Sequence, residues 1–224
     1  MAVRAVLLDA LGTLVELQPP GPRLRVRLEE LSGLDVGLEA AERGFAAEIS
    51  HYLVHHMEGG DRESLERLRD DCAAVMHDAL AVDGIERATV RRAMVESLEF
   101  ASYADAAPAL RELRSLGMRL VVASNWDCSL PEWLEGAGLW ELLDGAASSA
   151  VVGEPKPSPA VFHAALEIAG VGATEAVHVG DSLDNDIEGA RAAGIRAVLV
   201  DRSGAPAPAG VETVRSLGEV ASLV

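Results

Sequence analysis

The sequence of 224 residues predicts an α/β fold, a doubly wound parallel sheet interrupted by a block of helices. Short apolar runs that end at polar residues occur near the N-terminus and again beyond residue 100, as is typical of strands buried on both faces. Beyond residue 100 these runs alternate with segments of helical periodicity, which indicates a parallel sheet covered by helices. Between residues 18 and 100 the helical periodicity stands alone.

The predicted sheet begins with the apolar run from Val3 to Leu8, which stops at Asp9. A second strand is predicted at residues 120–123. Further strands are predicted at 176–179 and 197–200, with part of another at 151–152.

Helices are predicted between these strands from caps and apolar spacing. Asp105 is expected to cap a helix that ends at Gly117, and Ser158 with Pro159 is expected to open another that ends at Gly170. A third helix is predicted at 186–193, before Gly194, and residues 203–210 are predicted to form a loop.

The inserted block carries apolar residues at spacings of three and four, as on one face of a helix. Leu24, Leu28 and Leu31 form one such face, and a second runs from Leu65 to Leu80. We therefore predict an α/β core from residues 1–17 and 101–224, with a helical domain at 18–100.

Composition excludes several classes of function. With 19 basic and 36 acidic residues, the net charge is −17, which disfavours binding to nucleic acid or to an acidic membrane surface. No apolar run is long enough for a membrane helix, and no targeting segment is visible. Two cysteines cannot form a disulfide framework. We expect a soluble cytoplasmic protein, either a monomer or a homodimer, with a small-molecule substrate.

Polar residues follow the predicted strands, where ligands of open α/β sheets bind. Asp9, Gly12 and Thr13 follow the first strand, and Ser124 with Asn125 follows the second. Lys156 precedes the helix at Ser158. The later strand at 176–179 is followed by three carboxylates, those of Asp181, Asp184 and Asp186.

In chain order, these segments resemble the four motifs of the haloacid dehalogenase (HAD) superfamily: Asp9-Ala-Leu-Gly-Thr-Leu14, Ser124-Asn125, Gly153-Glu-Pro-Lys156-Pro and Gly180-Asp181-Ser-Leu-Asp-Asn-Asp186. The resemblance covers essentially the whole core and implies a Rossmann-like fold. The inserted helices resemble the cap domain of one subclass.

Asp9 occupies the position of the family's nucleophile. A carboxylate that attacks phosphorus forms an aspartyl-phosphate and divides one difficult displacement into two easier ones. Gly12 permits a sharp turn that brings backbone N–H groups toward an anion, and Thr13 is expected to bond the nucleophile and orient it.

The other motifs imply phosphate binding. The Ser124 hydroxyl and the backbone at Asn125 are expected to donate hydrogen bonds to phosphate oxygens. Lys156, held between Pro155 and Pro157, is expected to neutralise the phosphoryl group or the nucleophile itself.

The resemblance also implies a magnesium site. Its expected ligands are the carboxylates of Asp9, Asp181 and Asp186 with the backbone carbonyl of Leu11, since Mg²⁺ prefers oxygen ligands. Asp184 is left out of this set because an acidic residue at a helix N-terminus has an ordinary electrostatic role.

Leu11 departs from the pattern of most phosphatases in the family, which carry an acidic residue there to protonate the leaving alkoxide. General acid–base help is typically worth ~10²–10⁴-fold. We therefore expect a Mg²⁺-dependent hydrolase of a small phosphorylated metabolite, acting on a good leaving group or with a proton from elsewhere. The alternatives are a 2-haloacid dehalogenase-like hydrolase and a weakly active or non-catalytic phosphate-binding module.

Three other groups of residues are weaker candidates. His51 and His55 share a helical face but lack further metal ligands in a known pattern. Cys128 lacks an evident base. The arginines at 23, 25 and 27 are expected either to contact an anionic substrate or to lie in solvent, and none of the three is singled out.

Overall fold

The computed structural model describes residues 2–224. The chain divides into two compact units, one formed by Met1–Glu16 with Ala101–Val224 and the other by Leu17–Phe100. In the described part of the chain, no helix combines the length and the apolar character needed to span a lipid bilayer.

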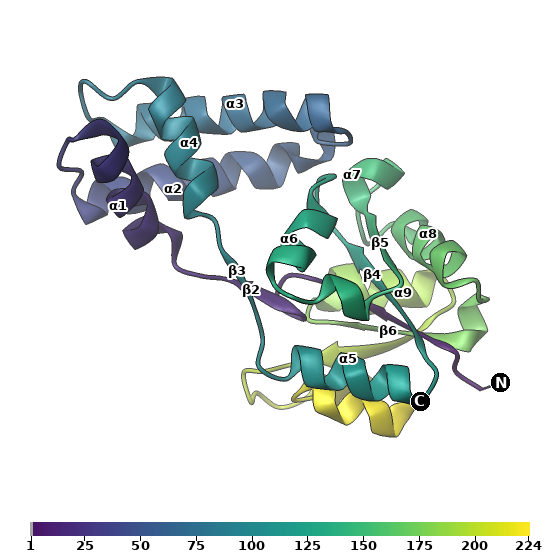
Figure 1. Cartoon of the computed structure of the whole chain (residues 1–224). Helices are drawn as coiled ribbons and strands as arrows, with labels where there is room; N and C mark the ends of the chain where they lie inside the picture. The colour runs from purple at the N-terminus through teal and green to yellow at the C-terminus, as the bar shows by residue number, and fades with distance from the viewer. Residues whose placement is uncertain (1) are drawn as a thin grey trace. The chain divides into compact units, whose positions relative to one another are not determined.

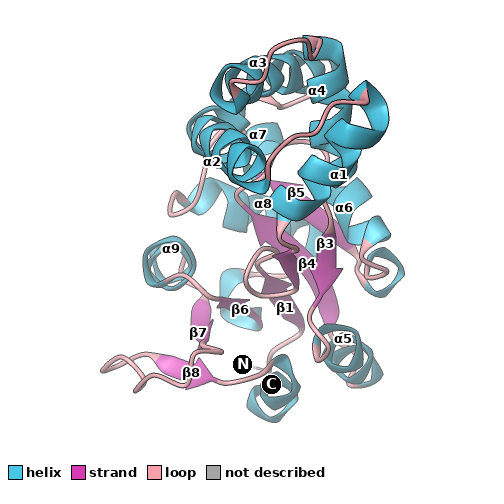
Figure 2. Ribbon diagram, turned by 90° about the vertical axis from the view of Figure 1, so that its left-hand side faces the viewer, coloured by secondary structure: helices cyan, strands magenta, loops and turns pink. Residues whose placement is uncertain are grey.

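The first unit contains a six-stranded sheet whose strands are all parallel (Figures 1 and 2). Its order is β5-β4-β1-β6-β7-β8, so β1 lies at the centre between β4 and β6. This order confirms the predicted α/β class. The strands are β1 (Ala5–Leu8), β4 (Arg119–Ser124), β5 (Gly145–Ser148), β6 (Ala176–Gly180), β7 (Arg196–Val200) and β8 (Glu212–Val214).

Helices cover both faces of this sheet, as Figure 2 shows for α5 and α9. On one face, α8 (Pro159–Ala169) and α9 (Gly189–Ala192) pack against apolar residues of β1 and β4 in a continuous core. The other helical segments of the unit are α5 (Ala106–Ser115), α6 (Leu130–Gly136), α7 (Ser149–Val152), η2 (Trp140–Leu142), η3 (Ala173–Glu175), η4 (Leu183–Glu188) and η5 (Leu217–Leu223). Because both faces are covered, the central strands are continuously apolar.

Helix α8 begins and ends as predicted. The Ser158 side chain accepts a hydrogen bond from the backbone N–H of Ala160, Pro159 is the first helical residue, and Gly170 adopts a left-handed conformation at the end. These capping signals depend only on neighbouring residues, so the sequence predicts them.

Two predictions in this unit were wrong, and a third helix was predicted with too late a start. Residues 151–152 belong to helix α7, and the strand is the preceding β5. The helix predicted at 186–193 begins earlier, as the π-helix η4 at Leu183. Asp105 makes no side-chain cap to α5, because its carboxylate binds Arg202 and the backbone N–H of Leu217 instead.

The second unit is built from four helices that contact one another in a closed cycle, α1 with α2, α2 with α3, α3 with α4 and α4 with α1. Figure 1 shows them lying alongside one another. Their bounds are α1 (Pro20–Ser32), α2 (Leu38–His55), α3 (Arg62–Leu80) and α4 (Arg87–Ser97), with the short η1 (His56–Glu58) after α2. Both predicted apolar faces contribute to its interior, through Leu24 and Leu28 of α1 and through Leu65, Leu68, Met76 and Leu80 of α3.

A two-stranded sheet lies where the chain passes between the units. It pairs β2 (Val15–Leu17) with β3 (Phe100–Ser102). Neither strand was predicted from the sequence, because three residues are too few to show an alternating pattern.

Candidate active site

The candidate site begins where three neighbouring strands end at the same level. In the register of the sheet, Leu8 of β1 lies beside Val122 of β4 and Val179 of β6. The next residues along these strands are therefore Asp9, Ala123 and Gly180, and the Asp9 backbone N–H still donates to the Val179 carbonyl, at 2.9 Å. Asp9, Ser124 and Asp181 consequently lie at one edge of the sheet, as expected for parallel strands.

Lys156 connects two of the carboxylates. Its Nζ lies 2.6 Å from Asp9 Oδ1 and 2.6 Å from Asp186 Oδ1, and its side chain is only 2% exposed. Lys156 is also the single lysine in the sequence; every other member of the 19 basic residues is arginine. A buried ammonium is stable only when paired, so Asp9 and Asp186 together make the burial of Lys156 possible.

Asn125 fixes the segment that carries Lys156. Its side-chain carbonyl accepts from the Lys156 backbone N–H at 2.7 Å, and its amide donates to the Lys156 backbone carbonyl at 3.1 Å. This reciprocal pair ties the loop after β4 to the loop before α8. Asn125 therefore acts through its side chain on Lys156, in addition to the phosphate contact expected of its backbone.

The carboxylate of Asp9 is held on one side only. Lys156 Nζ and the Ser124 hydroxyl, at 2.9 Å, both donate to Asp9 Oδ1. Neither of these bonds uses Oδ2. The two donors fix the orientation of the carboxylate and leave its second oxygen available to a ligand.

Asp186 is placed by the π-helix η4. The backbone N–H of Asp186 and that of Ile187 both donate to the Ser182 carbonyl, at 3.0 and 3.1 Å. The wider turn of a π-helix accommodates an additional residue, and such turns are frequent at functional sites. The Asp186 side chain thereby turns back toward β6, where Oδ2 accepts from the Ser182 N–H at 3.0 Å.

Two glycines allow the acidic residues to approach the backbone closely. A Cβ atom at Gly12, whose φ is +86°, would lie 2.1 Å from Asp181 Oδ2. A Cβ atom at Gly180 would lie 2.2 Å from Asp186 Cγ. Any side chain at either position would displace a carboxylate, so the glycines are required by the site as well as by the turn.

The cluster has a clear electrostatic pattern. Burial raises the pKa of Asp9 above its usual value even though Lys156 opposes this change. Burial also disfavours ionisation of Asp186, but the charge of Lys156 and the hydrogen bond from His178 outweigh it and hold the Asp186 pKa far below its usual range. Burial acts to lower the pKa of Lys156, yet Asp9 and Asp186 keep it raised.

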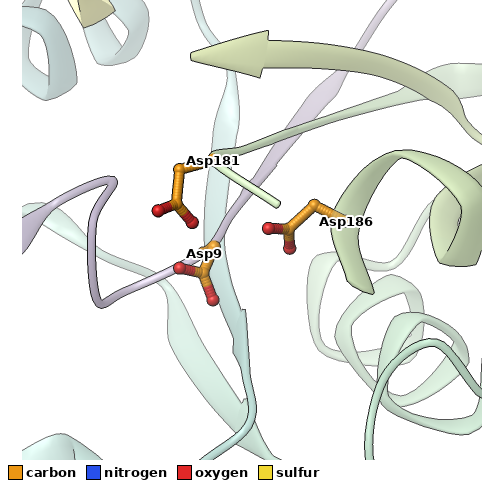
Figure 3. A group of neighbouring side chains, drawn as sticks. All are labelled: Asp9, Asp181 and Asp186. Carbon is orange, nitrogen blue, oxygen red and sulfur yellow. The ribbon is translucent and has the colours of Figure 1, made fainter. Parts of the chain in front are cut away.

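Asp181 completes an acidic triad with Asp9 and Asp186. Loss of hydration and repulsion from the other two carboxylates raise the pKa of Asp181 to about 6. One ligand atom from each residue lies within 4.8 Å of the others, and Figure 3 shows the three carboxylates converging. Three carboxylates against one ammonium leave an excess of negative charge, and hard oxygen donors suit Mg²⁺. The residues present therefore fit a divalent cation.

Other predicted site residues are placed differently from expectation. The Thr13 hydroxyl is buried and has no hydrogen-bond partner among residues 2–224, so the prediction that it bonds Asp9 was wrong. Leu11 lies in the same loop and is 46% exposed. Asp184 is exposed, in the first turn of η4.

His178, which lies within β6 and is fully buried, was not among the predicted site residues. Its Nε2 lies 2.9 Å from Asp186 Oδ1. The available signal was a single histidine inside an otherwise apolar strand, Ala176-Val-His-Val-Gly180.

A model of the family described as haloacid dehalogenase-like hydrolase matches residues 3–194. The chain belongs to the haloacid dehalogenase-like hydrolase family. The four motifs that suggested this resemblance lie within that match, and their side chains meet at the carboxyl edge of the sheet.

Individual relatives of this hydrolase carry related names. Human haloacid dehalogenase-like hydrolase domain-containing protein 3 is 30% identical over 207 residues, which cover 89% of this chain and 82% of the human protein. Its bovine counterpart is 45% identical over 91 residues, 41% of this chain and 36% of that protein. A phosphatase of Mycobacterium tuberculosis is 40% identical over 120 residues, 53% of this chain and 55% of that protein.

A solved structure extends the likeness over the whole fold. The crystal structure of a HAD phosphatase from Thermococcus onnurineus superposes with a TM-score of 0.66 and 25% identity, and the match covers 99% of this chain and 97% of that one.

Proposed function

We propose that this hydrolase is a Mg²⁺-dependent phosphatase that acts on a small phosphorylated metabolite through an aspartyl-phosphate on Asp9. The observation that carries the proposal is the buried bridge in which Lys156 Nζ contacts both Asp9 and Asp186 at 2.6 Å. The phosphatase relatives from M. tuberculosis and T. onnurineus support the same reaction class.

The orientation of Asp9 defines the attacking atom. Since Lys156 and Ser124 both donate to Oδ1, the lone pairs of Oδ2 face no donor from these two residues. Oδ2 attacks phosphorus, and the bond from phosphorus to the substrate oxygen breaks with its electron pair remaining on that oxygen. Water then attacks phosphorus, releasing inorganic phosphate and regenerating the Asp9 carboxylate.

Lys156 and Ser124 stabilise the negative charge of the phosphoryl group during these steps. An ammonium fixed in a buried position stabilises the negative charge of the phosphoryl oxygens without reorganising. In this proposal Ser124 donates to a phosphoryl oxygen once the ligand competes for its hydroxyl, and Gly12 gives the loop the sharp turn that lets it approach the phosphate. Asn125 contributes by holding the Lys156 backbone.

The acidic triad provides the metal site of this proposal. Asp9, Asp181 and Asp186 would hold Mg²⁺, together with the backbone carbonyl of Leu11. When bound, the ion would neutralise the phosphoryl group as the anionic nucleophile approaches it. The pKa of Asp181, raised to about 6 by burial and by repulsion from Asp9 and Asp186, supports this assignment because a bound cation would relieve the repulsion.

Leu11 shapes the proposed substrate class. Its side chain has no proton to give to a leaving alkoxide, so substrates whose leaving group needs no proton, such as acyl phosphates, are favoured. The helical unit Leu17–Phe100 is proposed as the cap domain, because it is inserted directly after the loop that bears Gly12 and Thr13.

A substrate panel with one variant tests the proposal. Wild-type protein and Asp9→Asn would be assayed with acyl phosphates, phosphate monoesters and 2-chloropropionate, each with Mg²⁺ and with EDTA. We expect Mg²⁺-dependent release of phosphate by the wild type and none by Asp9→Asn, whose side chain keeps the shape of aspartate. Wild-type activity in the variant would refute the nucleophile. Chloride release that EDTA leaves unchanged would instead establish a dehalogenase.

A further inference from the structure

The buried histidine of β6 contacts the candidate site through Asp186. His178 Nε2 lies 2.9 Å from Asp186 Oδ1, the same oxygen that accepts from Lys156 Nζ. Asp186 Oδ1 accepts a hydrogen bond from the Lys156 ammonium, which is a donor only, so Asp186 is paired as a carboxylate and the imidazole is assigned its hydrogen on Nε2. The direction of this hydrogen bond therefore follows from the chemistry of its acceptor.

The other ring nitrogen shows that this arrangement has a cost. His178 Nδ1 is buried and has no hydrogen-bond partner within residues 2–224. A buried polar atom without a partner destabilises a fold, and an apolar side chain would fill the position without that penalty. Packing alone, including the edge-to-face contact with Phe162 at 4.9 Å between ring centroids, would be satisfied by another aromatic ring.

We propose that His178 is a positioning residue, which holds the Asp186 carboxylate so that Asp186 in turn directs Lys156 toward Asp9. Three donors surround Asp186: His178 and Lys156 on Oδ1, and the Ser182 N–H on Oδ2. Ser182 and Lys156 lie in loops at the edge of the sheet, whereas His178 belongs to a central strand. His178 thus connects the reactive cluster to an interior strand of the sheet, paired on both sides.

The catalytic consequence rests on the proposed function. Without the His178 donor, Asp186 loses one of the contacts that fix its plane, and the Lys156 ammonium loses its fixed place beside Asp9 Oδ1. Groups that orient ligands and catalytic residues from behind typically change metal affinity or activity by ~10–100-fold when removed. The loss is expected in kcat, because Lys156 stabilises charge that develops during the reaction.

A matched pair of variants separates positioning from packing. His178→Gln retains an N–H donor at about the reach of Nε2, whereas His178→Met has a similar length and volume without a donor. We expect His178→Met to lower kcat by roughly 10–100-fold with little change in KM, and His178→Gln to retain most of the wild-type value. Thermal denaturation should give similar midpoints for the two variants. His163→Gln, an exposed histidine on α8, is the control.

A second readout does not depend on turnover. Because Lys156 is the single lysine, protein grown with lysine labelled with ¹³C at Cε gives one side-chain signal from this residue. We expect this signal to be unchanged in His178→Gln and shifted or broadened in His178→Met. Nitrogen NMR of the wild-type imidazole should show the hydrogen on Nε2.

These measurements distinguish failure of this inference from failure of the proposed function. Equal loss of kcat in both variants with an unchanged lysine signal would reduce His178 to a space-filling residue, as would a hydrogen on Nδ1. A wild-type protein without phosphatase activity would refute the proposed function, and the lysine signal would still report whether His178 positions Lys156.

Discussion

The α/β unit and the helical unit differ in where their charged side chains lie. At the edge of the sheet, Asp9, Lys156 and Asp186 are all buried and contact one another. In residues 17–100, ion pairs such as Arg67 with Glu63 and Arg92 with Glu96 lie at exposed positions on helix surfaces, and Glu48 is the buried acid. Burying charge is costly unless it is paired, so the location of the buried cluster indicates which unit carries out the chemistry.

The largest effect is expected from removing the buried cation. Lys156→Met leaves Asp9 and Asp186 close together without their ammonium, and breaking a buried pair in this way typically costs ~3–5 kcal/mol of stability. Phosphatase activity should fall to background. Denaturation in urea and assays with Mg²⁺ measure the two effects.

A second substitution tests the electrostatic origin of that loss. Combining Lys156→Met with Asp186→Asn removes one of the two uncompensated charges, so part of the stability should return while activity stays absent. Wild-type stability in Lys156→Met alone would show that the cluster is not held together by its charges.

Substitutions at Leu11 test whether the α/β unit lacks a general acid for the leaving group. Leu11→Asp adds an acid two residues after Asp9 and should raise turnover of phosphate monoesters with poor leaving groups by ~10²-fold or more, with little effect on acyl phosphates. Leu11→Asn, which has the same shape but no proton to transfer at neutral pH, is the control. Equal rates for the two variants would mean that protonation of the leaving group does not limit the reaction.

Much of the site was predictable because parallel strands bring their carboxyl ends to one edge. Asp9, Ser124 and Asp181 each follow an apolar run, and the register of β1, β4 and β6 places them together. The predicted convergence required only the strand pattern and the parallel arrangement.

The remaining features depend on side-chain conformation or on short segments. The bridge from Lys156 to Asp186 requires the π-helical turn of η4, which has no periodicity in six residues. Strand β5 has the sequence Gly145-Ala-Ala-Ser148, which lacks the branched apolar residues typical of strands. The strand was therefore predicted at the nearby valines, residues 151–152. The role of His178 was not predictable, because an apolar pattern indicates a buried strand but does not indicate what a polar residue within that strand contacts.

Glu48 provides the corresponding test in the helical unit. Burial raises its pKa from 4.5 to about 7, although a hydrogen bond from Cys72 opposes this change. An acid whose folded pKa is raised loses stability as pH rises, because the unfolded chain ionises first. The free energy of unfolding should therefore fall between about pH 4.5 and 7, by at most ~3 kcal/mol.

Glu48→Gln should remove this pH dependence and leave phosphatase activity unchanged. Urea denaturation at pH 5 and pH 8 measures the difference, and Glu39→Gln, at an exposed position in the first turn of α2, is the control. The same fall with pH in both variants would place its origin outside Glu48. A loss of activity in Glu48→Gln would show that the helical unit contributes a charged group to the reaction.

The smallest effect is expected at the surface of the helical unit. Arg91 of α4 forms ion pairs with Glu66 and Asp70 of α3, whose side chains are 47% and 65% exposed. Exposed pairs typically contribute ~0.2–1 kcal/mol and weaken with salt, because water solvates the separated charges almost as well. Arg91→Ala should therefore lower stability by about 1 kcal/mol or less, and the difference should shrink in 1 M NaCl. A loss as large as that of Lys156→Met would mean that pairing matters equally in both units, and burial would no longer explain why the reactive charges gather at the sheet.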